Sequence, residues 1–394
     1  MTAQPWWFGD ALTAGPHGLE LDGHPLAAVA REHGTCLYAY GAKTVRRRIG
    51  ELRAALASTG APHRLLFAMK ANRYRPLLDL LKREGDLGID ACSPREIARA
   101  LEAGFTRDQI SLTASMLSDR DLAQIAAAGV HVNLDTKSVL RRWAAQGGRR
   151  AGLRIDPAIC AGRGADPKLS YGGSKFGFAV NDAVAAARYA GSLGIEIDTL
   201  HVHAGWGLQQ SAAPLLARAW RALADVARAI PSVRAINVGG GLCARHRAED
   251  EPLSLATWAA LLREHLAPVG CTLICEPGTF IVASAGVLVC EVNTVENRAD
   301  GLWIGIDAGH NVNVYVAHYG IPLAIIPVAA PLAAPVRATH VAGNINEAND
   351  VFARSLPLPV LCEGDLVALY PAGAYGASMA SDHCLRGLPR EVLL

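Results

Sequence analysis

The stretch Leu65-Leu66-Phe67-Ala68-Met69-Lys70-Ala71-Asn72 places a lysine directly after a short apolar run. Such a run is consistent with a buried β-strand, and the residues that follow a strand are where a parallel barrel carries its chemistry. A lone lysine in this place is usually a solvated cap, because lysine is mostly an exposed residue. The meaning of Lys70 therefore depends on what stands at the ends of other strands.

Short apolar segments alternate with helix-like segments up to about residue 280. The expected strands are Leu65–Met69, Gly88–Ala91, Ile110–Leu112, Val130–Leu134, Gly152–Ile155, Thr199–His203, Ala235–Val238 and Thr272–Glu276. The expected helices are Pro76–Arg83, Pro94–Ala103, Asp119–Ala128, Lys137–Gln146, Asp182–Leu193, Ala212–Ala229 and Ala256–Leu266. This repeated alternation predicts an α/β fold, a (β/α)8 TIM barrel.

Beyond Gly278 the pattern changes to strand-like segments separated by Gly, Pro and Asn, which predicts a C-terminal all-β domain. Its expected strands include Val287–Val295, Leu302–Ile306, Val336–Val341 and Leu366–Tyr370. We therefore expect an N-terminal segment 1–34 that packs with the β domain, a cofactor-binding barrel over 35–279, and the β domain over 280–394.

Composition excludes several classes of protein. The 394 residues include 38 basic and 36 acidic ones, a formal charge of +2, which argues against a nucleic-acid partner. No stretch is long and apolar enough for a signal peptide or a membrane span. The nine cysteines form no CxxC pair and favour free thiols in a reducing cytoplasm. His201 and His203 are weak evidence for a metal without a nearby cluster of ligands, so we expect none.

The polar residues at the expected strand ends form one chemical set. They are Lys70, Asp90, Arg154, His203, the run Gly239-Gly240-Gly241, and Glu276. Because carboxyl ends of barrel strands meet at one mouth, we expect these residues to converge. Taken singly, a triple glycine is often a turn, a Glu before Pro a cap, and a strand histidine a packed side chain.

Together these residues indicate a lysine-bound cofactor with a phosphate. The Lys70 amine can form a Schiff base with an aldehyde cofactor, which then stabilises a carbanion at an amino-acid Cα. His203 could lie flat against the cofactor ring and Glu276 could face its pyridine nitrogen. The glycines let backbone N–H groups approach phosphate oxygens closely.

Motifs along nearly the whole chain carry a family resemblance. They are Phe67-Ala68-Met69-Lys70-Ala71-Asn72, Ser174-Lys175-Phe176-Gly177, His201-Val202-His203, Gly239-Gly240-Gly241, Glu276-Pro277-Gly278 and Gly373-Ala374-Tyr375-Gly376-Ala377-Ser378-Met379. With these motifs the chain resembles the fold-type III pyridoxal-phosphate decarboxylases, the group of diaminopimelate and ornithine decarboxylases, whose barrel is shared with alanine racemase.

The resemblance implies pyridoxal 5'-phosphate as cofactor and a role for each matching residue. Lys70 would be the Schiff-base lysine, His203 the ring-stacking histidine and Glu276 the partner of the pyridine nitrogen. Asp90 and Arg154 would orient the histidine and the cofactor's phenolic oxygen. The phosphate would be held by Gly239, Gly240, Gly241, Gly278 and Tyr375.

The resemblance also implies a head-to-tail homodimer with active sites built from both subunits. The segment Asn346-Glu347-Ala348-Asn349-Asp350 would then reach into the partner's site, and a single chain would be inactive. Glu347, Asp350 and Tyr315 are the expected substrate-binding residues from this part of the chain.

One departure from the family concerns the catalytic acid. Asn346 stands where the diaminopimelate enzymes have the cysteine that donates a proton. An amide cannot donate a proton as an acid, so another group or a water must do so. His383 and Cys384 are candidates, although a structural role is the more common one for each.

Other departures concern the substrate. Thr279 and Asn311 stand where family members carry arginines that bind the distal carboxylate of diaminopimelate, and neither residue replaces a guanidinium. Trp206 stands where a phosphate-binding serine is common, and could present an apolar wall to the substrate. We therefore expect a substrate other than meso-diaminopimelate.

The sequence thus predicts a decarboxylase of a non-standard amino acid or amino-acid conjugate, as in siderophore or other secondary-metabolite biosynthesis. A racemase, epimerase or lyase on the same cofactor is the alternative, since the usual acid is missing. A non-catalytic homologue that regulates a decarboxylase is a third reading. The retained Lys70 argues against it, because a binding protein has no need of a Schiff-base lysine.

Overall fold

The computed structural model describes residues 4–163 and 172–394, and the chain forms two compact units. The barrel unit consists of Arg48–Cys243 and Glu251–Phe280. The β unit consists of Met1–Arg47, Ala244–Asp250 and Ile281–Leu394. Among the described residues, no helix is long and apolar enough to cross a membrane.

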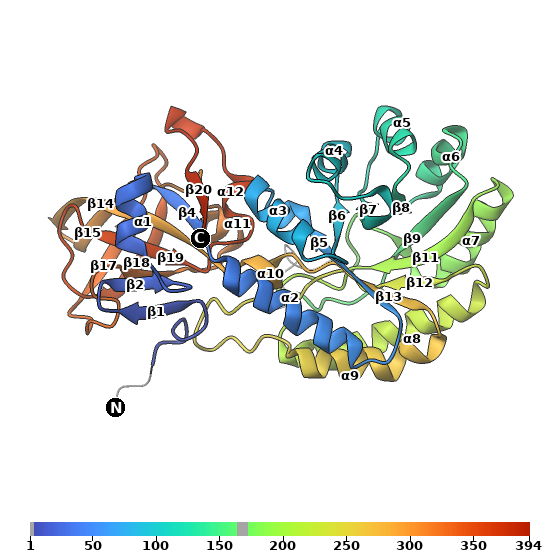
Figure 1. Cartoon of the computed structure of the whole chain (residues 1–394), viewed down its shortest axis with the longest axis horizontal. Coiled ribbons are helices and arrows are strands. Elements are labelled where there is room, and N and C mark those ends of the chain that lie inside the picture. Colours follow the sequence, from blue (N-terminus) through green and yellow to red (C-terminus); the bar gives the residue numbers. More distant parts are fainter. Residues whose placement is uncertain (1–3, 164–171) are drawn as a thin grey trace. The chain divides into compact units, whose positions relative to one another are not determined.

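Parallel strands form a closed ring in the barrel unit (Figure 1). In ring order they are β5 (His63–Ala68), β6 (Gly88–Ala91), β7 (Ile110–Thr113), β8 (His131–Leu134), β9 (Arg150–Asp156), β11 (Glu196–Val202), β12 (Ala235–Asn237) and β13 (Thr272–Cys275). The ring closes because β13 pairs with β5 and β8 pairs with β9. A short strand β10 (Phe178–Ala179) adds to β9.

Helices cover the outside of this ring, as Figure 1 shows for α4, α5 and α6 around β6, β7 and β8. The helices are α2 (Ala42–Ala57), α3 (Arg75–Arg83), α4 (Pro94–Glu102), α5 (Asp119–Ala128), α6 (Lys137–Ala145), α7 (Ala183–Ser192), α8 (Ala213–Ala229), α9 (Leu255–His265) and the short α10 (Thr279–Val282). Four of them begin after a Ser or Thr whose side-chain oxygen accepts a backbone N–H of the first turn. These caps are Ser93, Ser118, Thr136 and Ser254.

The β unit is built on a mixed sheet that uses both ends of the chain. Its strands run in the order β16 (Ala324–Pro327), β19 (Leu366–Tyr370), β14 (Gly286–Arg298), β15 (Gly301–Ile306), β17 (Arg337–Ala342) and β18 (Val351–Leu358). In addition, β4 (Leu37–Tyr40) pairs with β14, and β20 (Arg390–Leu393) pairs with β4. The N-terminal elements β1 (Leu12–Gly15), β2 (Gly18–Leu21) and α1 (Leu26–His33) share a buried core with β14 and β19, and the short β3 (His24–Pro25) pairs with β2. Two short helices, α11 (Tyr315–Tyr319) and α12 (Gly376–Met379), complete the unit.

The expected fold class, a (β/α)8 barrel followed by an all-β domain, is confirmed. Every barrel strand begins and ends within a few residues of its expected bounds, because short apolar runs bounded by polar residues mark buried parallel strands well. One difference concerns the expected start of the barrel at residue 35. Strand β4 pairs with β14 and β20, so residues 35–47 group with the β unit.

Candidate active site

Polar side chains follow the carboxyl ends of the barrel strands. Lys70 lies in a 3-10 turn (Met69–Ala71) directly after β5, and Asp90 is near the end of β6. Arg154 lies on β9, His203 follows β11, the three glycines follow β12, and Glu276 follows β13. Because these strands are parallel and adjacent in the ring, the barrel brings these expected residues to one end.

Lys70 is held by an ion pair. Its Nζ lies 2.6 Å from Asp90 Oδ2 and 3.4 Å from Cys92 Sγ. Burial, followed by the nearby charge of Glu276, raises the pKa of Asp90 to about 6, although Lys70 opposes the shift. Burial also raises the pKa of the Cys92 thiol to about 12. The lysine amine therefore faces one titratable carboxylate and one neutral thiol.

Glu276 is a buried carboxylate that two neighbours hold in place. Its Oε1 accepts a hydrogen bond from the Asn237 amide at 2.5 Å, and its Oε2 lies 3.0 Å from His201 Nε2. Burial raises the pKa of Glu276 and lowers that of His201 well below the usual value. This carboxylate has a fixed direction, as a partner for a pyridine nitrogen requires.

His203 is kept neutral. Burial, and then the positive charge of Arg154, hold its pKa well below the usual value. The backbone N–H of Gly240 donates to His203 Nδ1 at 3.3 Å, which fixes the ring beside the glycine turn. The Arg154 guanidinium itself lies over the Phe176 ring, 4.0 Å from its centroid. A neutral, oriented imidazole is well suited to lie against an aromatic cofactor.

The glycine run makes a turn that no other residue fits. A Cβ on Gly239, Gly240 or Gly241 would lie 2.5, 2.6 or 2.5 Å from the carbonyl oxygens of Val202, Glu276 and Gly205. Gly239 and Gly241 also have positive φ angles of 67° and 104°. A Cβ on Gly278 would lie 2.7 Å from Ala71 Cβ, so this glycine lets β13 approach the Lys70 turn. The Gly239 N–H donates to Asn237 Oδ1 at 2.9 Å and the Gly240 N–H to His203 Nδ1, and these bonds hold the turn in the close backbone path that a phosphate cradle uses.

Trp206 and Thr279 lie together near this turn. Trp206 Nε1 donates to Thr279 Oγ1 at 2.9 Å, and the carbonyl of Trp206 accepts the backbone N–H of Arg163 at 2.9 Å. Thr279, which stands where a family arginine is missing, thus contacts Trp206, and the backbone of Trp206 contacts the backbone of Arg163.

The other expected residues belong to the β unit. Asn346 is exposed, and Glu347 Oε1 lies 3.3 Å from His383 Nε2, whereas Cys384 is exposed with no such partner among the described residues. The buried Asp350 carboxylate accepts backbone N–H groups of His310 and Ile345 at 2.7 and 3.0 Å, so it holds its own loop.

Three more of the residues singled out from the sequence lie in the β unit: Tyr315, Tyr375 and Asn311. Tyr315 is buried and stacks on His246 with ring centroids 5.6 Å apart. Tyr375 has a positive φ of 59° just before α12. Asn311 uses its amide to donate to the Ser381 carbonyl at 3.1 Å.

Four residues near the site were missed from the sequence: His201 as a partner of Glu276, Cys92, Asn237 and Arg163. Three of them carried a signal. His201, Cys92 and Asn237 each lie two positions from an expected site residue (His203, Asp90 and Gly239), and along a strand such neighbours face the same side. Arg163 lies in a connection and carried no such signal.

Known proteins share this arrangement. The sequence profile of the pyridoxal binding domain of pyridoxal-dependent decarboxylases matches residues 42–283. The chain belongs to this family. The decarboxylase is 34% identical to a diaminopimelate decarboxylase of Methanothermobacter thermautotrophicus over 95% of this chain and 90% of that protein. It is 32% identical to one from Streptomyces coelicolor, over 95% and 88% of the two chains.

Solved structures agree with the sequence comparisons. The diaminopimelate decarboxylase of Helicobacter pylori in complex with L-lysine superposes with a TM-score of 0.86 at 27% identity, covering 94% of each chain. The expected family, the PLP cofactor and the carboxy-lyase activity are thus confirmed. The lysine, the buried carboxylate, the neutral histidine and the glycine turn fit PLP.

The expectation that diaminopimelate is excluded is wrong. Relatives at 30–34% identity over about 95% of the chain are diaminopimelate decarboxylases. The error has a physical reason. Thr279 and Asn311 remove two guanidiniums at two positions, but they do not determine which charged groups the rest of the site presents. Arg163, whose backbone N–H donates to the Trp206 carbonyl, is an arginine in the neighbouring segment.

Replacing Gly240 with Ala should weaken PLP binding by about tenfold or more, because the new Cβ forces the turn away from the Glu276 carbonyl. Titration of the apo protein with PLP, followed by cofactor absorbance, measures the effect. Gly191→Ala on α7 is the matched control, since nothing lies within 4 Å of its Cβ position. Unchanged PLP affinity in Gly240→Ala would contradict the cradle.

Asp90 should make the apo protein less stable as pH rises from about 4 to 6. The folded-state pKa of Asp90, about 6, exceeds its unfolded value, so the folded protein keeps the Asp90 proton to a higher pH than the unfolded chain does. The free energy of unfolding therefore falls by about 3 kcal/mol over this range. Urea unfolding between pH 4 and 7 measures the slope. Asp90→Asn should flatten it, and Asp225→Asn, at an exposed site, should not. An equal slope in Asp90→Asn would refute the shift.

Proposed function

We propose that this decarboxylase removes one carboxylate of meso-diaminopimelate to give lysine. The observation that carries the proposal is the 34% identity over nearly the full length of a diaminopimelate decarboxylase. Several further relatives with the same activity cover the barrel and the β unit alike. A shared fold alone would support many activities, but likeness over both units narrows the choice.

The barrel unit supplies the groups that hold and tune the cofactor. PLP, when bound, supplies the electron sink for the negative charge left at the substrate Cα. Lys70 would be the residue whose amine bonds the cofactor aldehyde, and Glu276 would face the pyridine nitrogen. His203 would lie against the ring, Asp90 and Arg154 would orient its polar edge, and Gly239–Gly241 would hold the phosphate.

Two further residues complete the phosphate site in this proposal. Gly278 allows the close approach of β13 to the Lys70 turn, which supports its place beside the phosphate. Tyr375 is held in a left-handed backbone conformation before α12, which supports a defined direction for its side chain. These roles rest on the positions of the residues at the strand ends and on the family match.

The proton for the substrate Cα comes from a pair in the β unit. Asn346 cannot act as an acid. Glu347 and His383, with their polar atoms 3.3 Å apart and both about half exposed, can hold and pass a proton. We assign them the role that the family cysteine plays, and Asn346 a positioning role.

The distal carboxylate of the substrate is bound by Arg163. A guanidinium binds a carboxylate through two parallel hydrogen bonds. The support is that the Arg163 backbone N–H donates to the carbonyl of Trp206, whose side chain bonds Thr279, so an arginine is carried by the segment next to the position of the missing family arginine. Trp206 forms the apolar wall along the substrate chain, and Tyr315 and Asp350 hold the β-unit loops that carry the remaining contacts.

The active enzyme is a homodimer in which each site uses both subunits. The support is that Asn346 and Glu347 lie on an exposed loop of a unit different from the one that carries Lys70. Isologous dimers place such a loop against the partner by symmetry.

The PLP-loaded enzyme should release carbon dioxide from meso-diaminopimelate faster than from lysine, ornithine or arginine. Arg163→Gln should raise the KM for diaminopimelate about tenfold or more, since a charged hydrogen bond is lost. The KM of Arg163→Lys should lie between those of the wild type and of Arg163→Gln. Arg221→Gln, an exposed arginine of α8, is the control. Release of carbon dioxide from another amino acid but not from diaminopimelate would contradict the proposed substrate. An unchanged KM in Arg163→Gln would contradict the role of Arg163.

Mixed dimers should show whether sites are shared. Lys70→Ala and Glu347→Gln should each be inactive, and co-expression should restore about a quarter of wild-type activity, because half of the dimers then hold one complete site. Lys70→Ala mixed with His203→Ala should restore none, since both changes fall in the same unit. No recovery in the first mixture would mean that each site is built from one chain.

A further inference from the structure

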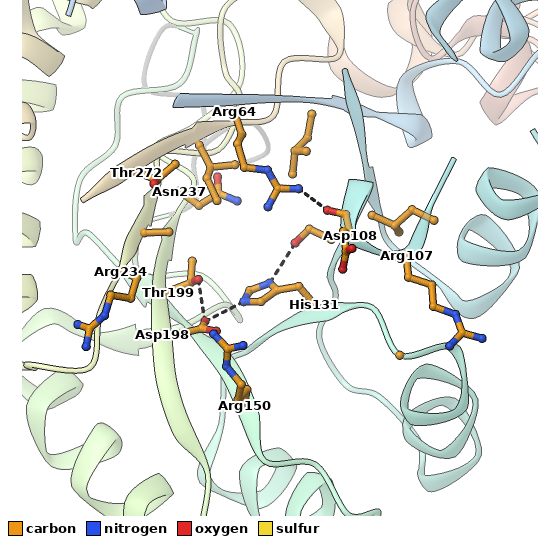
Figure 2. A pocket seen from close by; sticks show the side chains of 16 residues that line it. Arg64, Arg107, Asp108, His131, Arg150, Asp198, Thr199, Arg234, Asn237 and Thr272 are labelled. Atoms are coloured by element: carbon orange, nitrogen blue, oxygen red, sulfur yellow. Dashed lines mark hydrogen bonds and ion pairs between the residues drawn. The ribbon is translucent and has the colours of Figure 1, made fainter. Parts of the chain in front are cut away.

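A second cavity lies at the other end of the barrel from Lys70. It has a volume of about 320 Å³ and is lined by residues at the beginnings of strands, such as Arg64 of β5, His131 of β8 and Arg150 of β9. The candidate active site is at the carboxyl ends of the same parallel strands. Figure 2 shows this cavity from close by, and its lining includes neither Lys70 nor Glu276.

The lining carries more positive than negative charge. Four arginines stand against two aspartates, Asp108 and Asp198, and Figure 2 shows the arginines on four sides of the His131–Asp198 pair. The arginines are Arg64, Arg107, Arg150 and Arg234.

One aspartate is already neutralised. Asp198 Oδ2 pairs with Arg150 at 2.9 Å, and its Oδ1 lies 3.0 Å from His131 Nε2 and accepts the Thr199 hydroxyl at 2.9 Å. The charges of Asp198 and Arg150 therefore cancel. The remaining lining holds three arginines against Asp108 alone.

These three arginines make no ion pair with any residue in the described parts of the chain. Arg64 donates to the backbone carbonyl of Asp108. Arg234 donates to the carbonyls of Pro231 and Val233 at 2.6 and 3.1 Å. Carbonyl acceptors fix the direction of a guanidinium without cancelling its charge. Arg64 points toward the middle of the cavity, whereas the side chains of Arg107 and Arg234 lie at the rim and point away from the middle (Figure 2).

One further hydroxyl lines the cavity beside Arg64, that of Thr272 on β13. The hydroxyls of Thr199 and Ser111 also line it, but they already contact Asp198 and His131. A guanidinium that keeps its charge, beside a hydroxyl, suits the oxygens of a phosphate. Shaped cavities of this volume with a few convergent polar groups are typical of small-ligand sites.

We propose that this cavity binds a small phosphate dianion, free or as an ester, separately from the phosphate of PLP. The charge of the ligand matches the excess of arginines. Arg64 meets its oxygens in the middle, and Arg234 and Arg107 add positive charge at the rim. The ordinary alternative is that these arginines are solvated strand caps that make the end of the barrel soluble. Saturable binding of phosphate distinguishes a binding site from solvated strand caps.

The test is calorimetric titration of the PLP-saturated protein with inorganic phosphate at constant ionic strength, since bound PLP occupies its own phosphate cradle. We expect saturable binding of one phosphate per chain. The double variant Arg64→Gln/Arg234→Gln should weaken it about tenfold or more, while Arg221→Gln should leave it unchanged. If the double variant fails to fold, Arg64→Lys, which keeps the charge but loses the forked donors, should still weaken binding several-fold.

A comparison of two ligands, inorganic phosphate and phenyl phosphate, shows whether the cavity prefers the free ion or an ester. Phenyl phosphate binding as tightly as inorganic phosphate would assign the cavity to phosphate esters, and weaker binding would assign it to the free ion. Both outcomes uphold the proposal. Absence of saturable binding, equal affinity in the double variant, or tighter binding of succinate than of phosphate would each overturn it.

Discussion

The buried carboxylate of Glu276 is the interaction on which the rest of the site depends. Removing a carboxylate from water costs several kcal/mol unless hydrogen bonds compensate. Asn237 and His201 provide that compensation, which requires strands β11, β12 and β13 to be adjacent. The barrel closure thus determines the electrostatics of the site as much as its shape.

This charge influences each neighbour. It adds to the burial that raises the pKa of Asp90, which in turn holds Lys70. His203 stays neutral because burial, and then the positive charge of Arg154, hold its pKa well below the usual value. Burial is the largest cause of the raised pKa of both carboxylates, Asp90 and Glu276, and of the lowered pKa of both histidines, His201 and His203.

The sequence allowed the barrel and most of its site to be predicted. Short apolar runs identified the strands, and residues such as Lys70, Asp90 and Glu276 could be located because chemistry in a barrel follows strand ends. The partners of these residues were harder to predict, because they depend on which strands become neighbours. Asn237 and Glu276, for example, are 39 positions apart.

Substrate recognition was the part that sequence reasoning got wrong. Thr279 and Asn311 were interpreted as a loss of carboxylate binding, yet Arg163 lies next to the first of them through Trp206. A connection between strands has no periodicity from which its position could be read. For the same reason, the loop that carries Glu347 could be matched to a family motif, but its ion pair with His383 was not foreseen.

Cys92 shows what burial does for chemical selectivity. A thiolate 3.4 Å from the Lys70 amine would be a strong competing nucleophile for any aldehyde that reached the site. With its pKa raised to about 12, the thiol stays protonated and unreactive. The buried Cys92 thiol therefore does not compete with the Lys70 amine for the cofactor aldehyde.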